Sequence, residues 1–213
     1  MEPATKQLEF EALKARVAQL ETELQANPEQ WRPAAAYPMY EAVSGFVLGI
    51  AGAAVALLAN VIAAPMAGKD PLQLIRVYLT FPLGEKALAL GTAQGGSHSI
   101  GDGMILAFGC CLYLGTGMLL GALFQPVLRR LADRSFFGRL FVASALSLLV
   151  WVVGFYGILS WLQPATCGGN WITDNSVLPW WVAAVKHLIF GWTMAILYPL
   201  GRFRPPVAEV EKS

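Results

Sequence analysis

The sequence predicts an all-α fold, a bundle of four transmembrane helices preceded by a short N-terminal helix. Three observations support it: long apolar runs, few charged residues, and arginines that gather after the second and fourth runs. Of the 213 residues, 56% are hydrophobic and 14% are charged, whereas a soluble domain carries about 25% charged residues. Each run has the roughly 20 residues that a helix needs to cross a ~30 Å hydrocarbon core. The runs lie at residues 43–64, 103–124, 140–162 and 180–200.

The charges between the runs predict how the chain is oriented. Residues 163–179, between the last two runs, contain no lysine or arginine, which is typical of a loop outside the cytoplasm. Arginines instead follow the second and fourth runs, and the positive-inside rule places both segments in the cytoplasm. We therefore expect a multi-pass protein of a bacterial-type inner membrane, with its N-terminus and C-terminus both cytoplasmic. These arginines are Arg129, Arg130, Arg134, Arg139, Arg202 and Arg204.

The length of the chain allows one membrane domain, for which we take residues 43–204. Residues 1–27 are expected to form a helix, residues 28–42, which contain three prolines, a linker, and residues 205–213 a tail. The net charge of +1 and the basic residues at the ends of the runs argue against nucleic acid as a partner. The three cysteines match neither a disulfide framework nor a metal-binding pair.

The N-terminal helix carries a row of apolar residues at alternating spacings of three and four, as in the a/d seam of a coiled coil. The seam covers little more than two heptads, and short isolated helices are marginal in water. We therefore expect it to pair with itself or with another membrane subunit. The alternative is a helix lying on its own bundle or on the membrane surface. The seam residues are Phe10, Leu13, Val17, Leu20 and Leu24.

Pairs of glycines predict where the membrane helices pack. Gly45 and Gly49 form a GxxxG motif in the first run, and Gly117 and Gly121 form another in the second. Such motifs let helix backbones approach closely, which stabilises association in lipid, where no hydrophobic drive exists. We expect these glycines to pack helices of one chain against each other, with assembly between subunits as the alternative.

The loop between the first two runs contains its own apolar segments. Residues 71–82 are strongly apolar but too short to span a bilayer, and residues 83–90 favour a helix. Both are expected to form short interfacial helices on the outer leaflet. Residues 91–103 are rich in glycine and serine but lack the lysine of a phosphate-binding loop. We expect them to form a flexible connection to the second run.

Lys186 and His187 are candidate functional residues inside the last run. They lie six and seven residues after Trp180, about 10 Å below the outer interface at 1.5 Å per residue. Ionisable groups at this depth are costly and by default indicate function. The alternatives are a Lys186 side chain that extends to the interface and a structural His187 that is hydrogen-bonded between helices.

His187 has two further candidate roles, the handling of a proton or quinol and the ligation of haem or a metal. His98, the other histidine of the chain, could bind the opposite face of a haem. The runs contain no acidic pair and no serine–histidine–aspartate set, so we expect neither catalytic residues nor a metal site. We also expect no cofactor, with haem or quinone at His187 as the alternative.

The last run contains a string that resembles a known pattern. HLIFG, from His187 through Phe190 to Gly191, is similar to an H-x-x-[FY]-G signature in the final helix of small four-crossing bacterial membrane proteins. Some of these uncharacterised proteins occur alongside components of respiratory oxidases. The resemblance covers one helix of four, and it implies a membrane bundle associated with electron-transfer complexes.

Packing surfaces outnumber reactive groups in this sequence. We therefore expect an accessory or structural subunit of a larger membrane complex, in which lipid and other membrane subunits are the partners, rather than an enzyme. The alternative is a membrane protein that binds haem or quinol, or handles protons, through His187. A channel is disfavoured because no run carries the repeated polar stripe that would line a pore.

Overall fold

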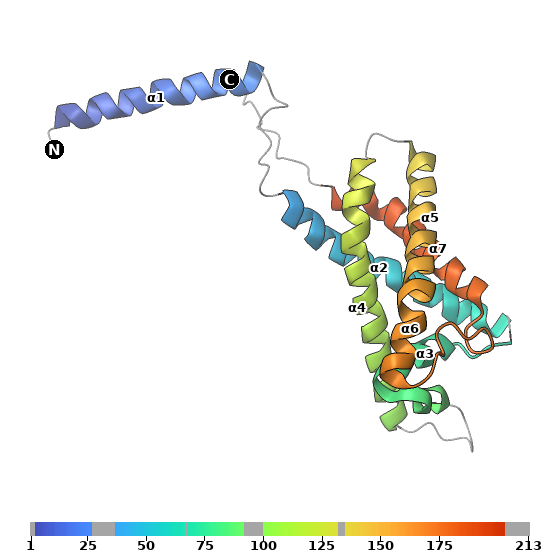
Figure 1. The fold of residues 1–213 in the computed structure, drawn as a ribbon. Helices are drawn as coiled ribbons and strands as arrows, with labels where there is room; N and C mark the ends of the chain where they lie inside the picture. Colours follow the sequence, from blue (N-terminus) through green and yellow to red (C-terminus); the bar gives the residue numbers. More distant parts are fainter. Residues whose placement is uncertain (1–2, 27–36, 67, 92–99, 132–134, 203–213) are drawn as a thin grey trace. The chain divides into compact units, whose positions relative to one another are not determined.

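The computed structural model describes residues 3–26, 37–66, 68–91, 100–131 and 135–202. Every regular element in these ranges is a helix (Figure 1), which confirms the predicted all-α class for the described residues. The chain divides into two compact units, Met1–Tyr37 and Pro38–Ser213.

The first unit consists of helix α1, Pro3–Ala26. Four seam residues expose between 42% and 66% of their surface. The fifth, Leu24, belongs to the helix, and its side chain lies outside the described residues. An open apolar row is what a helix needs in order to pair with another helix, and the pairing itself stays a prediction. The four exposed residues are Phe10, Leu13, Val17 and Leu20.

The second unit is a helical bundle in which α5, η2 and α6 follow one another without a break and form one rod (Figure 1). Its elements are α2 (Tyr37–Met66), α3 (Gln73–Leu83), the 3₁₀ helix η1 (Gly84–Ala89), α4 (Ile100–Arg130), α5 (Phe136–Val152), the π-helix η2 (Val153–Leu159), α6 (Ser160–Cys167), α7 (Trp180–Leu197) and the 3₁₀ helix η3 (Tyr198–Gly201).

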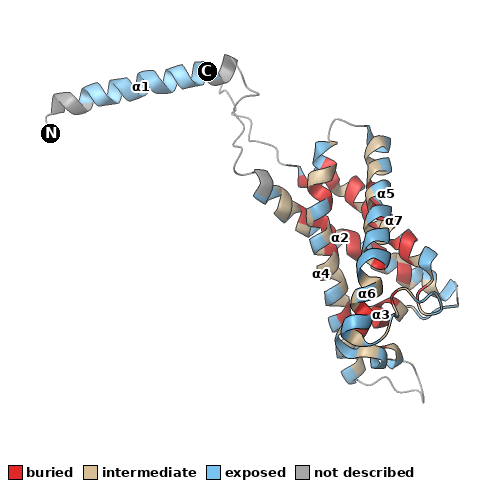
Figure 2. Cartoon of the chain, viewed as in Figure 1, coloured by how far each residue is buried: buried red, intermediate tan, exposed pale blue. Residues whose placement is uncertain are grey.

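Four helices of the described residues are long and apolar enough to cross a membrane. Large apolar side chains such as Phe108, Leu119 and Phe141 are exposed on them, and Figure 2 shows exposed residues along α4 and α5. Apolar surface of this kind suggests contact with lipid and supports a multi-pass membrane protein. The four spans are Met39–Met66, Ile100–Arg130, Phe136–Cys167 and Trp180–Gly201.

The helices extend past the predicted apolar runs. Residues 37–42, assigned to the linker, form the first turns of α2, since a proline is tolerated in the first turn of a helix. Residues 163–167, assigned to the outer loop, form the end of α6, where Gln163 is fully buried and accepts a hydrogen bond from the Ile172 N–H at 2.9 Å. The apolar runs mark the part of each helix that suits lipid, and polar residues continue the helices beyond it.

Glycines bring α2 and α4 into close contact. A Cβ atom added to Gly45 would lie 2.7 Å from the carbonyl oxygen of Gly121, and one added to Gly49 would overlap the carbonyl oxygen of Gly117. Carbon atoms in good contact lie about 3.5–4.0 Å apart, so these positions have no room for a side chain. The two GxxxG motifs therefore face each other within one chain.

Two residues of the HLIFG string pack α7 against its neighbours. A Cβ atom added to Gly191 would overlap the Ser147 hydroxyl on α5, and one added to Gly52 of α2 would lie 3.0 Å from the Phe190 ring. The Phe190 ring also meets Phe124 of α4 edge-on, with the two ring centroids 5.2 Å apart. Phe190 and Gly191 thus serve packing, and His187 is the polar member of the string.

Charged residues connect the helices at one end of the bundle. The Arg129 guanidinium on α4 forms an ion pair with Glu41 on α2. The Arg139 guanidinium carbon on α5 lies 5.8 Å from the ring centroid of Tyr198 in η3, within cation–π range. These arginines belong to the set that the sequence analysis places on the cytoplasmic side.

Helix α3, in the connection between the first two spans, packs beside α4, η1 and α6 (Figure 1). The sequence analysis expects short helices on the outer leaflet at residues 71–82 and 83–90. The structure forms α3 and η1 there, and apolar side chains of α3 such as Ile75 and Leu79 are buried against protein. The reason is Gly109 on α4, where an added Cβ atom would lie 2.6 Å from Ile75 and 2.8 Å from Leu79. The side chains of α3 that are 0% exposed are Ile75, Val77, Leu79 and Thr80.

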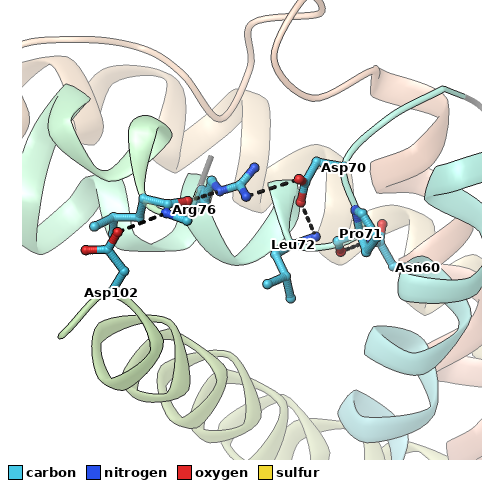
Figure 3. A network of polar contacts seen from close by, with 8 residues as sticks. Asn60, Asp70, Pro71, Leu72, Arg76 and Asp102 are labelled. Carbon is cyan, nitrogen blue, oxygen red and sulfur yellow. Dashed lines mark hydrogen bonds and ion pairs between the residues drawn. The ribbon is translucent and has the colours of Figure 1, made fainter. Parts of the chain in front are cut away.

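Arg76 holds the loop around α3 in place (Figure 3). Its side chain is 2% exposed, and Nη2 lies 3.1 Å from the Asp70 carboxylate. Its Nε donates a hydrogen bond to the Leu90 carbonyl at 2.6 Å, and next to this the Gly91 N–H donates to the Asp102 carboxylate of α4 at 3.3 Å. The buried guanidinium thus joins Asp70, before α3, to Leu90, after η1, and the Gly91–Asp102 hydrogen bond joins the same segment to α4.

Candidate functional site

Lys186 and His187 of α7 line a cavity of about 40 Å³ inside the bundle. At roughly 10–15 Å³ per water molecule, it has room for about three or four waters. Water occupies such a cavity only where it meets several polar partners, and side chains from α3, α4 and α7 supply them. The polar lining consists of Tyr78, Tyr113, Thr116, Lys186 and His187, and the apolar lining of Ala53, Leu74, Gly117, Leu120, Phe155 and Phe190.

Lys186 is buried without a charged partner. The residue is 6% exposed, so its side chain does not extend to the surface. Among the described residues, the side-chain amine has neither an ion pair nor a protein hydrogen bond. A buried cation without a partner is strongly destabilising, and the cavity is the place where water or a ligand can supply the missing hydrogen bonds.

One ring nitrogen of His187 has a protein partner. Nδ1 lies 2.8 Å from the Ala183 carbonyl oxygen one turn earlier in α7. Because a carbonyl oxygen can only accept, this contact assigns the hydrogen of a neutral imidazole to Nδ1. Nε2 then carries the lone pair and can accept a proton or a hydrogen bond. His187 lines the cavity together with other polar residues of the described part of the chain.

The π-helix η2 brings Phe155 to the site. Phe155 is 7% exposed and meets the His187 ring edge-on, with the ring centroids 5.4 Å apart. A π-helical turn inserts an additional residue into a helix and is frequent at functional sites. Within η2, a Cβ atom added to Gly154 would meet open space, and one added to Gly157 would have only Val153 nearby. The sequence analysis treats this segment as ordinary transmembrane helix and misses Phe155.

Two tyrosines also line the cavity. The Tyr78 ring on α3 meets the Tyr113 ring on α4 edge-on, with the centroids 5.1 Å apart. Burial raises the pKa of Tyr78 to about 12, against the smaller lowering effect of its hydrogen bond with Thr116. The Tyr78 hydroxyl therefore keeps its proton at physiological pH. No sequence signal indicated these tyrosines, since they meet only because α3 inserts beside α4.

The cavity does not fit a haem or a quinone ring. A volume of about 150 Å³ takes up a single benzene molecule, and this cavity has about 40 Å³. His98, the second candidate haem ligand, lies outside the described residues. Within the described ranges, no group of three or more His, Cys, Asp or Glu side chains could hold a metal ion.

No family model, no curated protein and no solved structure matches this chain. Its function is therefore inferred from the geometry of the site.

Proposed function

We propose that this chain is a proton-binding membrane protein, in which Lys186 and His187 take up and release a proton inside the bundle. The observation that carries the proposal is Lys186, a residue 6% exposed whose amine has no protein partner among the described residues, and which lines a cavity large enough for a few waters. Ionisable residues within membrane helices commonly belong to proton relays.

The neighbouring groups suit proton exchange. Nε2 of His187 can accept a proton while Nδ1 stays bound to the Ala183 carbonyl, so protonation requires no rotation of the ring. The Tyr78 and Thr116 hydroxyls line the same cavity, and hydroxyls both donate and accept hydrogen bonds. Water in the cavity could thus connect the amine, the imidazole and the hydroxyls.

The proposal is tested by following the protonation of His187 directly. The chain contains two histidines, so His98→Gln leaves His187 as the single imidazole in an NMR spectrum of histidine-labelled protein in nanodiscs. We expect the His187 signals to change as the pH is lowered through the histidine range, and the midpoint to move in the Lys186→Met variant. Lys86→Met is the control, because Lys86 is exposed on η1. Constant His187 signals over this range, or an equal midpoint in both lysine variants, would refute the proposal.

A second candidate function is that of an accessory subunit of a larger membrane complex. The specific observation in its favour is the exposed seam of α1, where Leu13 exposes 66% and Leu20 42% of their surface. Burying an apolar row against another helix is the ordinary way in which a short helix becomes stable in water. The partner is then a second copy or another membrane subunit.

Charged substitutions in the seam test this second function. Leu13→Glu with Leu20→Glu should lower the mass of the particle that is purified in mild detergent, and Ala15→Glu, on another face of α1, should not. An unchanged mass in the double variant, with the same co-purifying chains, would contradict pairing through α1.

We further propose that the protein is a bacterial-type inner-membrane protein with both termini in the cytoplasm, as the arginines predict. Ser135 and Ser176 lie in the connections at opposite ends of the α5–η2–α6 rod. In a chain without its native cysteines, an impermeant thiol reagent applied from the periplasm should label Ser176→Cys and spare Ser135→Cys. Labelling of Ser135→Cys alone would reverse the orientation.

A further inference from the structure

A second cavity, of about 90 Å³, lies between the end of α2 and the start of α7. We call it the α2–α7 groove. Its α2 wall consists of Ala59, Asn60, Ala63 and Ala64, and its α7 wall includes Trp181 and Val185. Lys186 and Leu74 line both the groove and the proton-binding cavity, so these two residues separate the groove from the first site.

The groove opens onto the surface of the bundle that lipid would cover. Trp181 and Val185 expose 49% and 44% of their surface. Along α7 the lining runs from Pro179 to Ile189, a rise of about 15 Å at 1.5 Å per residue. This depth is about half of a ~30 Å hydrocarbon core, and therefore matches the acyl chain of a single leaflet.

The rim of the groove carries a cation. Lys69 is exposed, and its ammonium donates one hydrogen bond, at 3.4 Å, to the Ser176 carbonyl. The neighbouring Asp70 carboxylate is an ion-pair partner of Arg76, which offsets its negative charge. The apolar groove thus ends, on the side predicted to face outward, beside a lysine that can bind an anionic group.

We propose that the α2–α7 groove binds one anionic phospholipid of the outer leaflet, with an acyl chain along the alanines of α2 and the headgroup at Lys69. Three features carry this assignment: the apolar lining, the depth of one leaflet and the single exposed cation at the rim. The bound chain covers the aliphatic part of Lys186 and keeps bulk water from reaching its amine through the groove. This site shares Lys186 and Leu74 with the proposed proton-binding cavity, and its other lining residues are different.

The test uses the full chain in nanodiscs that contain phosphatidylglycerol and phosphatidylcholine. Native mass spectrometry then counts the lipids that remain bound. Ala63→Phe fills the groove, and Ile62→Phe adds the same ring at a neighbouring position of α2 that is 61% exposed. We expect one retained phosphatidylglycerol in the unmodified chain and in Ile62→Phe, and a loss of about tenfold or more in Ala63→Phe, equivalent to 1.4 kcal/mol. Lys69→Gln should remove the preference for phosphatidylglycerol while leaving a lipid bound.

Several outcomes would overturn the proposal. Equal retention in the two phenylalanine variants would show that the lipid does not occupy the groove. Equal retention of the two lipids by the unmodified chain would remove the role of Lys69. If Ala63→Phe elutes as aggregate, Ala64→Phe replaces it, since Ala64 also lines the groove. None of these results affects the His187 titration, so the two proposals fail separately.

Discussion

Replacing Lys186 with methionine is expected to stabilise the protein. Methionine is unbranched, similar in length to lysine and apolar, so it can occupy the same space without a charge. Lys186 makes no hydrogen bond or ion pair to the described residues, so the substitution removes no known polar contact. It does remove the cost of keeping an amine at 6% exposure within a membrane bundle.

The gain can be bounded from the position of the residue. A lysine at the centre of a membrane helix costs about 2.5–3.5 kcal/mol on insertion scales. Lys186 lies about 9 Å from the end of the span at Trp180, at 1.5 Å per residue, and the few waters that fit its cavity recover part of the cost. We therefore expect Lys186→Met to raise the free energy of unfolding by about 1–3 kcal/mol, within the range found when buried charges are replaced by apolar residues.

The assay is reversible unfolding in mixed micelles with increasing SDS, followed by circular dichroism. Lys86→Met, at an exposed position of η1, should change the unfolding free energy by less than about 0.5 kcal/mol. A loss of stability in Lys186→Met would refute the reasoning, because it would mean that the amine has a structural partner. A gain in stability together with an altered His187 titration would mean that Lys186 lowers the stability of the bundle and serves proton binding.

Three further predictions concern the bundle and α1. Gly121→Ala should destabilise the bundle by about 1–3 kcal/mol, because its Cβ would lie 2.5 Å from the Gly49 Cα. The control Gly115→Ala, whose Cβ meets open space, should leave the stability unchanged. Equal SDS unfolding curves for the two variants would contradict the α2–α4 contact. Asp70→Asn leaves the buried Arg76 without its counter-charge, so it should lower the free energy of unfolding more than Arg76→Met does in the same assay. The reverse order would mean that the ion pair does not stabilise the bundle. A chain truncated before residue 28 should keep the SDS unfolding midpoint of the bundle, since α1 belongs to a separate compact unit.

The helical spans followed from the sequence because lipid imposes a simple rule. A segment that crosses a bilayer must satisfy its backbone internally and cover about 30 Å with apolar side chains, so length and composition suffice to find it. The ends of the helices could not be predicted from the sequence, because residues such as Gln163 are polar yet buried by contacts with Thr80 and Ile172. Such contacts join segments far apart in the sequence.

Only part of the candidate site could be predicted from the sequence. Lys186 and His187 stand out because ionisable residues are rare in apolar runs. Tyr78, Tyr113 and Phe155 are ordinary residues of apolar segments, and they reach the site through the insertion of α3 and the π-helical turn of η2. The sequence predicted a short helix at residues 71–82 but not its insertion beside α4, and the additional residue in η2 produces no periodic pattern that sequence inspection could detect.

Two departures from the most stable local structure meet at this cavity. The π-helix η2 replaces the tighter hydrogen-bonding pattern of an α-helix, and Lys186 places an amine where an apolar side chain would pack at lower cost. If each served the fold alone, there would be no reason for them to lie within one cluster of side chains, with Phe155 of η2 against His187, the neighbour of Lys186. Local costs of this kind are expected to coincide at functional sites, where the arrangement is kept for what it does rather than for its stability. Their coincidence is the physical reason to place the function of the protein at Lys186 and His187 rather than on the glycine-packed contact between α2 and α4.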